Sequence, residues 1–530
     1  MFVKKLVTQV VCNPDDPVAI TPKGKLRGAL VDGTYVFRGI KYANAERFHE
    51  PVPVGPWKGI KDAIMYGPAC LEISTVQPND NYTVPHVFYP QSEDCLYLNV
   101  WTQSINDPEK KRPVLVWFHG GGYSTGSGIE HFAYDGENMS RFGDVVVVTL
   151  NHRLNILGYF DLSKYGEEYK NSGNLGHMDL IEALKWVRDN IASFGGDPDN
   201  VTIFGQSGGG GKVASLLQCP PADGLFHRAI IESGVAKDTQ MDRSIKDLDK
   251  IVMERLGITP ERVKELETVP YYRFQQIIGE MGFMAAMSFG PHADGEFYLG
   301  SIFSVPVSEH AKTIPVMVGN VLGEGNNNFY CTIDDNRKNS WSEEKREAVI
   351  RSKFGALTER AIAAQKKAYP GKNIANLLFT DRRTRPASVE YAVIRASQGA
   401  VPTYNFLFCL EADFYGGVLP WHNAEIPYVF HNADYIEPSY IPGVTERLQD
   451  IVCGAWCRFA ECGDPNGVFG LPTWHPVTEE DHYTLLFDEE TREARNHDEE
   501  LMEVLQEANV SLDQIRRQKT AKFFGGGPRI

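Results

Sequence analysis

The chain is 530 residues long and carries a formal net charge of −16, from 69 acidic and 53 basic side chains. This acidic balance argues against binding to nucleic acid or to an anionic membrane surface. No run of about 18 apolar residues occurs, so no membrane insertion is expected. Nine cysteines in a chain of this length are too sparse for a disulfide framework.

The first residues do not have the pattern of a secretion signal. The segment Met1–Gln9 contains two lysines, and its short apolar run soon gives way to polar residues. It is too short and too polar for a signal peptide. We therefore expect a cytoplasmic protein with mostly free thiols and a small-molecule substrate. Whether it is a monomer or a homo-oligomer does not follow from the sequence.

Short apolar runs and turn signals alternate over residues 1–50, which predicts small antiparallel strands. From Pro68 to Asp94 the sequence is polar and aromatic without a period, and it predicts a long surface loop. Apolar strands then alternate with helical stretches. Strands are expected at Cys95–Trp101, Val114–Phe118, Val145–Leu150, Val201–Phe204, Ala229–Ile231, Val316–Val318 and Thr403–Cys409, and helices from Asp179, at Lys212–Gln218 and at Thr445–Cys462.

This alternation predicts the α/β class, with a large, mostly parallel central sheet flanked by helices. Residues 236–310 and 341–400 are helical and mixed, and we expect them to be helical insertions over the site. No linker, repeat or low-complexity tract interrupts the chain. Residues 1–530 are therefore expected to form a single domain, with a last prominent helix at Thr445–Cys462 and a polar tail in which 520–530 are mobile.

The most informative motif is Gly205-Gln206-Ser207-Gly208-Gly209, which lies between a predicted strand and a predicted helix. In the G-x-S-x-G pattern the serine occupies a tight, strained turn, and glycines flank it because larger side chains would collide. The N-terminus of the following helix favours the negative charge of an oxyanion. The five residues alone also fit a structural turn, but the strand and the helix around them favour a nucleophile.

A second glycine-rich segment, His119-Gly120-Gly121-Gly122, directly follows a predicted buried strand. Three glycines allow the backbone to approach a ligand and to turn its N–H groups toward it. The segment therefore predicts an oxyanion hole, with a further N–H from Gly208, although a simple glycine-rich turn fits the same pattern.

A serine nucleophile needs a base and an acid that orients the base. In this fold the chain order is serine, acid, histidine. Glu324 lies between two glycines just after the strand at Val316–Val318, which suits the acid, although a surface glutamate in a turn fits equally well. His422 follows the next predicted strand and suits the base, whereas His431 and His475 lie on less suitable stretches.

Taken in chain order, these motifs resemble those of the type-B carboxylesterases, the cholinesterase-like branch of the α/β-hydrolases. The resemblance extends from about residue 17 to residue 500. Its segments are Ser92–Val100, His119–Gly122, Asn174–Gly176, Asn190–Pro198, Gly205–Gly209, Arg228–Gly234, Gly323–Gly325, His422–Phe430 and Gly463–Asn466.

The resemblance implies an α/β-hydrolase fold with helical insertions capping the site, and a serine carboxylic-ester hydrolase that needs no cofactor and no metal. It implies a triad of Ser207, Glu324 and His422. It further implies Gly121, Gly122 and Gly208 as oxyanion donors, Ser233 as a second-layer serine near the triad, Arg47 and Glu93 as an ion pair, and Cys70 and Cys95 as the pair that forms the family's first disulfide, whose formation stays open.

The chain departs from the family pattern at two places. The family usually has alanine after the nucleophile, whereas Gly208 begins a run of four glycines here, so we expect a somewhat looser elbow. The loop at Leu71–Asp94 does not match the choline-binding loop, which argues against a quaternary ammonium substrate and favours small to medium uncharged esters. Two alternatives stay open: amide or carbamate hydrolysis at the same triad, and a non-catalytic binding protein, which the complete triad disfavours.

Overall fold

The structure is a computed structural model, and it describes residues 8–73, 86–107, 109–235, 237, 247–286, 288–325, 333–436 and 440–508. The predicted mobile tail at 520–530 lies outside these residues. So does part of the long loop predicted between Pro68 and Asp94.

The strands, in chain order, are β1 (Val10–Val11), β2 (Val18–Thr21), β3 (Gly24–Arg27), β4 (Ala29–Val31), β5 (Thr34–Lys41), β6 (Ala43–Asn44), β7 (Val52–Pro53), β8 (Ile60–Asp62), β9 (Ala69–Cys70), β10 (Gln91–Ser92), β11 (Tyr97–Thr102), β12 (Arg112–Phe118), β13 (Val146–Leu150), β14 (Gly196–Gln206), β15 (Arg228–Glu232), β16 (Val316–Val321), β17 (Thr403–Phe408), β18 (Tyr483–Phe487) and β19 (Arg492–Arg495).

The α-helices are α1 (Glu137–Gly143), α2 (Asn155–Tyr159), α3 (Leu175–Asn190), α4 (Gly208–Leu216), α6 (Leu248–Leu256), α7 (Tyr271–Met281), α8 (Phe283–Ala286), α9 (Glu309–Lys312), α10 (Ile333–Asn336), α11 (Glu343–Phe354), α12 (Thr358–Ala368), α13 (Thr384–Ser397), α14 (Ile426–Val429), α15 (Thr445–Cys462) and α16 (Glu499–Glu507).

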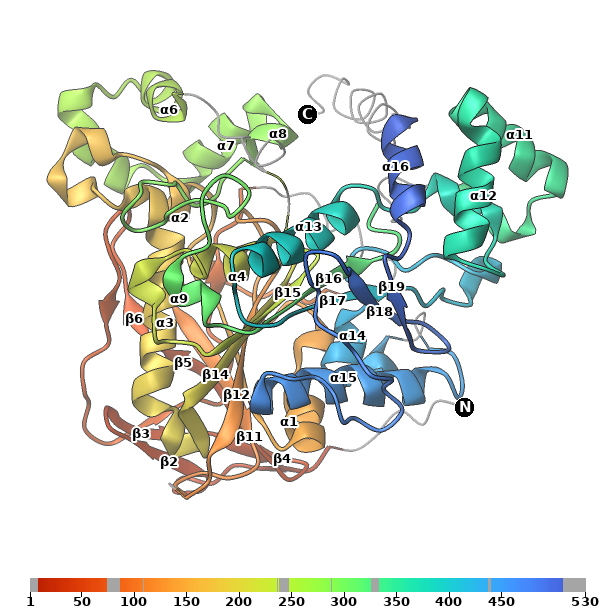
Figure 1. Ribbon diagram of the computed structural model, residues 1–530. Coiled ribbons are helices and arrows are strands. Elements are labelled where there is room, and N and C mark those ends of the chain that lie inside the picture. The colour runs from red at the N-terminus through yellow and green to blue at the C-terminus, as the bar shows by residue number, and fades with distance from the viewer. Residues whose placement is uncertain are drawn as a thin grey trace.

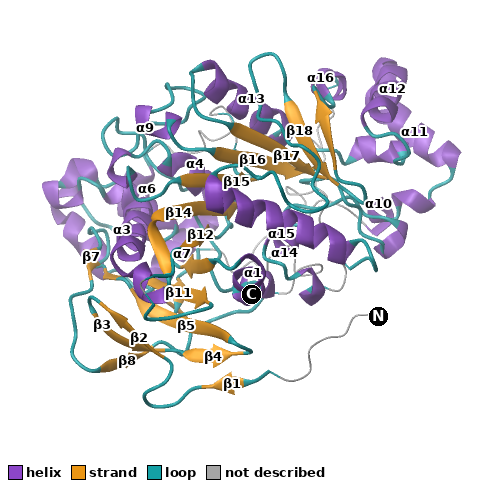
Figure 2. Ribbon diagram, turned by 60° about the horizontal axis from the view of Figure 1, so that its bottom comes forward, coloured by secondary structure: helices purple, strands orange, loops and turns teal. Residues whose placement is uncertain are grey.

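A large sheet runs through the centre of the molecule, with helices on both of its faces (Figures 1 and 2). Within the described residues it has twelve strands in the order β1-β4-β5-β11-β13-β12-β14-β15-β16-β17-β18-β19. Every neighbouring pair from β13 to β18 is parallel, whereas the pairs at both ends are antiparallel. The predicted α/β class and the mostly parallel sheet are therefore confirmed.

The apolar side chains of the central strands supply two separate cores, because successive residues of a strand point to opposite faces. Along β12, Val116 and Phe118 pack into the core that lies under α3, α4 and α13. Leu115 and Trp117 point the other way, into the core under α1, α14 and α15 that also contains Trp456. Burial on both faces explains why β12 and β13 are nearly continuous apolar runs in the sequence.

The two regions expected to be helical insertions do contain helices, α6 to α9 in the first and α11 to α13 in the second. Figure 1 shows α6, α7 and α8 at the upper left and α11 and α12 at the upper right of the view. That these helices cap the site stays a prediction. Among the helices described, none combines the length and the apolar character needed to cross a bilayer.

The end of the chain differs from the sequence-based expectation. The helix at Thr445–Cys462 was expected to be the last prominent one, but β18, β19 and α16 follow it. The helix α16 buries Leu501, Val504 and Leu505 against α12, while glutamates cover its outer face. A short helix and an exposed edge strand rich in charged residues have the polar composition of a tail, and their sequence therefore hides the fold of this region.

Candidate active site

Ser207 occupies a strained turn between β14 and α4. Its backbone angles are φ 58° and ψ −125°, which a residue with a side chain rarely adopts. The turn is held by two backbone hydrogen bonds: the Ser207 N–H donates to the Glu232 carbonyl at 2.8 Å, and the Gly211 N–H donates to the Ser207 carbonyl at 2.9 Å. The serine side chain is thus fixed at the carboxyl end of the parallel strands, where α/β folds carry their ligand sites.

The loop after β12 passes directly beside this serine. A Cβ atom placed on Gly120 would lie 3.3 Å from the Ser207 Cβ, and one placed on Gly208 would lie 2.0 Å from the Gly122 carbonyl oxygen. Gly121 and Gly122 have φ angles of 81° and 65°, in the region that favours glycine. The structure therefore brings the three predicted oxyanion donors, Gly121, Gly122 and Gly208, together around Ser207.

The start of α4 is tightly packed. A Cβ on Gly209 would lie 1.9 Å from the Phe118 carbonyl oxygen, and one on Gly210 would lie 2.8 Å from the Glu232 carbonyl oxygen. The four glycines let the helix approach β12 and β15 more closely than any side chain would allow. These glycines thus serve close packing, and the looser elbow stays a prediction.

Glu324 and His422 face each other from two turns at the same end of the sheet. The turns are tied together by the Gly323 N–H, which donates to the Pro420 carbonyl at 3.1 Å. The His422 Nδ1 atom is hydrogen-bonded to Glu324 Oε2. Since an ionised carboxylate only accepts, Nδ1 carries the proton and Nε2 is left as the basic nitrogen of the neutral ring.

The Glu324 carboxylate is anchored by further donors. The Ser233 hydroxyl donates to Glu324 Oε1 at 2.6 Å, and the Val321 N–H donates to the same oxygen at 3.0 Å. The Glu324 side chain is 8% exposed, against 33% for His422. The acid is thus fixed within the protein, while the imidazole reaches toward the open side of the site.

Gln206, which the sequence analysis did not single out, connects the pair to the serine turn. Its side-chain Nε2 lies 3.4 Å from both ring nitrogens of His422. Gln206 directly precedes Ser207, so this contact brings the imidazole next to the serine turn.

Three more carboxyl groups with raised pKa values lie close to Glu324 or to one another. Burial, followed by the charges of Glu232 and Glu324, raises the pKa of Glu425 well above its ordinary value. Burial raises the pKa of Glu232 to about 8, although the Trp456 indole N–H donates to its Oε1 at 2.8 Å. Burial and the charge of Glu324 raise the pKa of Asp381 to about 6. Sequence spacing gave no sign of these groups, because it does not report burial.

The two residue pairs implied by the family resemblance are both in contact, Arg47 with Glu93 and Cys70 with Cys95. The Arg47 Nε donates to Glu93 Oε2 at 2.8 Å. Cys70 and Cys95 are both buried and are free thiols in the structure. A hydrogen bond with Cys70, together with burial, raises the pKa of the Cys95 thiol.

Comparisons with known proteins match esterases over almost the whole chain. A model described as the carboxylesterase family matches residues 15–504. The chain is 33% identical over 488 residues to para-nitrobenzyl esterase of Bacillus subtilis (strain 168), covering 89% of this chain and 95% of that protein. It is 32% identical over 500 residues to phenmedipham hydrolase of Pseudarthrobacter oxydans, covering 90% and 96%.

A solved structure gives a similar result. It is described as an esterase from anaerobic Clostridium hathewayi that can hydrolyze aliphatic aromatic polyesters. Its TM-score with this chain is 0.88 at 43% sequence identity, over 95% of this chain and 100% of that chain.

Proposed function

The chain belongs to the carboxylesterase family and is a carboxylic ester hydrolase, and from this premise we propose that it cleaves small to medium uncharged esters through Ser207, His422 and Glu324. The resemblance to type-B carboxylesterases is thereby confirmed at the level of family and reaction. The observation that supports the triad best is the hydrogen bond between His422 Nδ1 and Glu324, formed beside a strained serine turn.

The proposed reaction proceeds through an acyl-enzyme. The Ser207 Oγ attacks the ester carbonyl while His422 Nε2 accepts its proton, and Glu324 stabilises the imidazolium that forms. The N–H groups of Gly121, Gly122 and Gly208 stabilise the oxyanion, and such a donor typically contributes about 10²–10³ in rate. The alcohol leaves with the proton from His422. Water then attacks the acyl group, with His422 again acting first as base and then as acid.

The charge around the site argues against an anionic substrate. Glu324 is a buried carboxylate whose charge reaches Asp381 and Glu425, so an anionic acyl group would meet repulsion there. The relative described as hydrolyzing aliphatic aromatic polyesters also supports an ester without a charged group next to the scissile bond.

Replacement of Ser207 by alanine tests the proposal. We expect Ser207→Ala to lose at least about 10³ in kcat while its unfolding temperature stays near that of the wild type, because the nucleophile is lost but the fold is not. Ser352→Ala, at an exposed serine of α11, is the matched control and should keep full activity.

Covalent labelling gives an independent readout of the same assignment. A fluorophosphonate should modify Ser207, as located by peptide mass spectrometry, and block turnover. Near-normal turnover by Ser207→Ala, or a label on another residue, would show that the assignment of the nucleophile is wrong.

A further inference from the structure

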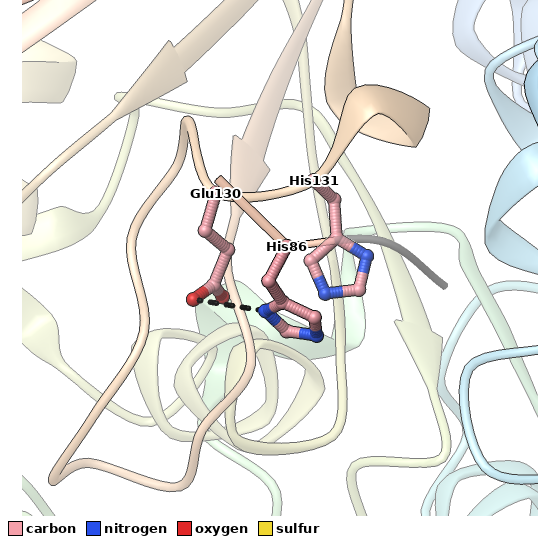
Figure 3. Close-up of side chains that lie close together, drawn as sticks. All are labelled: His86, Glu130 and His131. Carbon is pink, nitrogen blue, oxygen red and sulfur yellow. Dashed lines mark ion pairs between the residues drawn. The ribbon is translucent and has the colours of Figure 1, made fainter. Parts of the chain in front are cut away.

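Three side chains capable of binding a metal lie close together beside the glycine loop: His86, Glu130 and His131. One nitrogen or oxygen atom of each lies within 4.8 Å of those of the other two. The His86 Nδ1 is 3.7 Å from Glu130 Oε2. Figure 3 shows the Glu130 carboxylate directed at His86 and the imidazole of His131 beside the His86 ring. The centroids of the two imidazole rings are 4.0 Å apart, with the ring planes at 70°.

The cluster is largely buried. The side chains of His86 and Glu130 are 6% and 17% exposed, and His131 is 5% exposed. Removing three such polar groups from water is unfavourable unless other polar or charged groups compensate for the lost hydration. A bound cation would interact favourably with all three groups at once.

The donor set fits zinc. Two imidazole nitrogens and one carboxylate oxygen are ligands that Zn²⁺ takes in proteins, with a water in the fourth position. Bond lengths of about 2.0–2.2 Å place tetrahedral ligands roughly 3.4 Å apart. The separation between His86 Nδ1 and Glu130 Oε2 is already close to that value. The remaining ligand atoms lie within 4.8 Å of one another, so binding an ion would draw the three side chains closer together.

The backbone holds the two contributing segments in register. His86 and His131 form an antiparallel bridge, and the Val87 N–H donates to the Glu130 carbonyl at 2.6 Å. The His131 ring also stacks on Tyr134, with centroids 4.6 Å apart and planes within 9°. The two backbone segments that carry the ligands are thus held together before any ion arrives, which favours a metal site.

We propose that His86, Glu130 and His131 bind one zinc ion. The sequence suggested no metal site, because the two histidine-bearing segments are more than 40 residues apart and have no recognisable ligand spacing. The site would join the segment that carries His86 to the loop that follows the oxyanion glycines. A Cβ on Gly126 in that loop would lie 3.0 Å from both Glu130 Oε1 and His119 Nδ1, so Glu130 lies against the glycine loop. The ion would therefore stabilise the wall of the active site without touching the reacting atoms.

Zinc titration of the full-length protein tests the proposal. After the protein is stripped with a chelator, calorimetry with zinc chloride should show one equivalent bound with a dissociation constant of about 10 µM or tighter, and the unfolding temperature should rise with zinc. His86→Ala and His131→Ala should each weaken binding at least tenfold. His475→Ala is the matched control, because the half-exposed His475 pairs with Glu493 and belongs to no group of three metal-binding side chains within the described residues.

Equal zinc affinity in the wild type and in both His86→Ala and His131→Ala, or no binding by the wild type, would overturn the proposal. X-ray absorption of the zinc-loaded wild type needs no variant and so does not depend on variant folding. It should show two imidazole ligands with oxygen ligands at about 2.0–2.1 Å. A shell of oxygen atoms alone would exclude this site.

Discussion

At the scale of single residues, the identity of the acid is the assignment that most needs a test. Glu324 is rigid, since Ser233 and the Val321 N–H both donate to its Oε1. The nearest competitors in sequence are Asp334 and Asp335. The Asp334 side chain is 67% exposed and forms an ion pair with Lys345 at 2.8 Å, which lowers the Asp334 pKa. It is thus a surface residue whose charge is already paired.

We expect Glu324→Gln to lower kcat by up to about 10⁴, because it removes the charge that stabilises the imidazolium and favours the wrong tautomer. Glu324→Asp should be milder, since the charge remains and only the reach is shorter. Asp334→Asn should have almost no effect. Steady-state kinetics of the three variants on one ester decide which carboxylate is the acid. Loss of activity in Asp334→Asn together with a tolerated Glu324→Gln would move the acid to Asp334.

The sequence could predict some of these residues and not others for a physical reason. Ser207, Glu324 and His422 follow strands, and the carboxyl ends of parallel strands meet at one edge of the sheet. Chain order and glycine flanks were therefore enough to single them out. Gln206, Glu232 and Glu425 act through burial and through contacts across the fold, which no local pattern encodes. The cluster of His86, Glu130 and His131 escaped notice for the same reason.

At the scale of secondary structure elements, the strands buried on both faces were the easiest to predict. The apolar run of β12 was found within two residues of its observed start. The helix α4 was expected from Lys212 but begins at Gly208, because glycine has a poor helix propensity and tertiary packing overrides it. Edge strand β19, with charged residues on both faces, gave no apolar alternation to detect.

The close contact between α4 and the glycine loop leads to a prediction for Gly208. An alanine Cβ there would lie 2.0 Å from the Gly122 carbonyl oxygen, so the backbone of the oxyanion loop must shift. We expect Gly208→Ala to lower kcat by roughly 10-fold or more, since the oxyanion donors depend on precise placement. Gly279→Ala is the control: its Cβ meets nothing within 4 Å on helix α7, and alanine favours a helix.

Steady-state kinetics and thermal unfolding of both glycine variants distinguish an effect on catalysis from an effect on stability. Gly279→Ala should be as active as the wild type and at least as stable. Gly208→Ala with unchanged kcat would mean that the glycine loop moves freely, and that the tight packing at the start of α4 does not set the position of the oxyanion donors.

At the scale of the whole molecule, buried charges connect elements that are far apart in the chain. Arg153 and Asp179 form an ion pair at 2.7 Å with side chains 3% and 0% exposed. Arg385 of α13 pairs with Asp498, which precedes α16, at 3.2 Å. Breaking one partner of such a buried pair typically costs about 3–5 kcal/mol, because the other charge is left uncompensated. Glu232 differs from these groups, since its hydrogen-bond donor is the neutral indole of Trp456.

Glu232 should therefore make the stability of the whole molecule depend on pH. Its pKa is raised from 4.5 to about 8 by burial, so the folded protein keeps a proton that the unfolded chain releases. The contribution of Glu232 to the free energy of unfolding is therefore fully present below about pH 4.5 and falls as the pH rises toward 8. Above that value it is constant. Each unit by which the folded and unfolded pKa values differ is worth roughly 1.4 kcal/mol.

We expect Glu232→Gln to reduce the loss of stability with rising pH. The amide oxygen can still accept from the Trp456 indole N–H, and the amide never ionises. The free energy of unfolding, measured by urea denaturation at pH 5 and pH 8, should fall less between the two values in the variant than in the wild type. Glu461→Gln is the control, since the Glu461 side chain is 58% exposed on α15 and should leave the pH dependence unchanged. Parallel pH profiles for the wild type and Glu232→Gln would show that Glu232 is ionised in the folded protein, and that the interior between β15 and α15 accommodates a charge there.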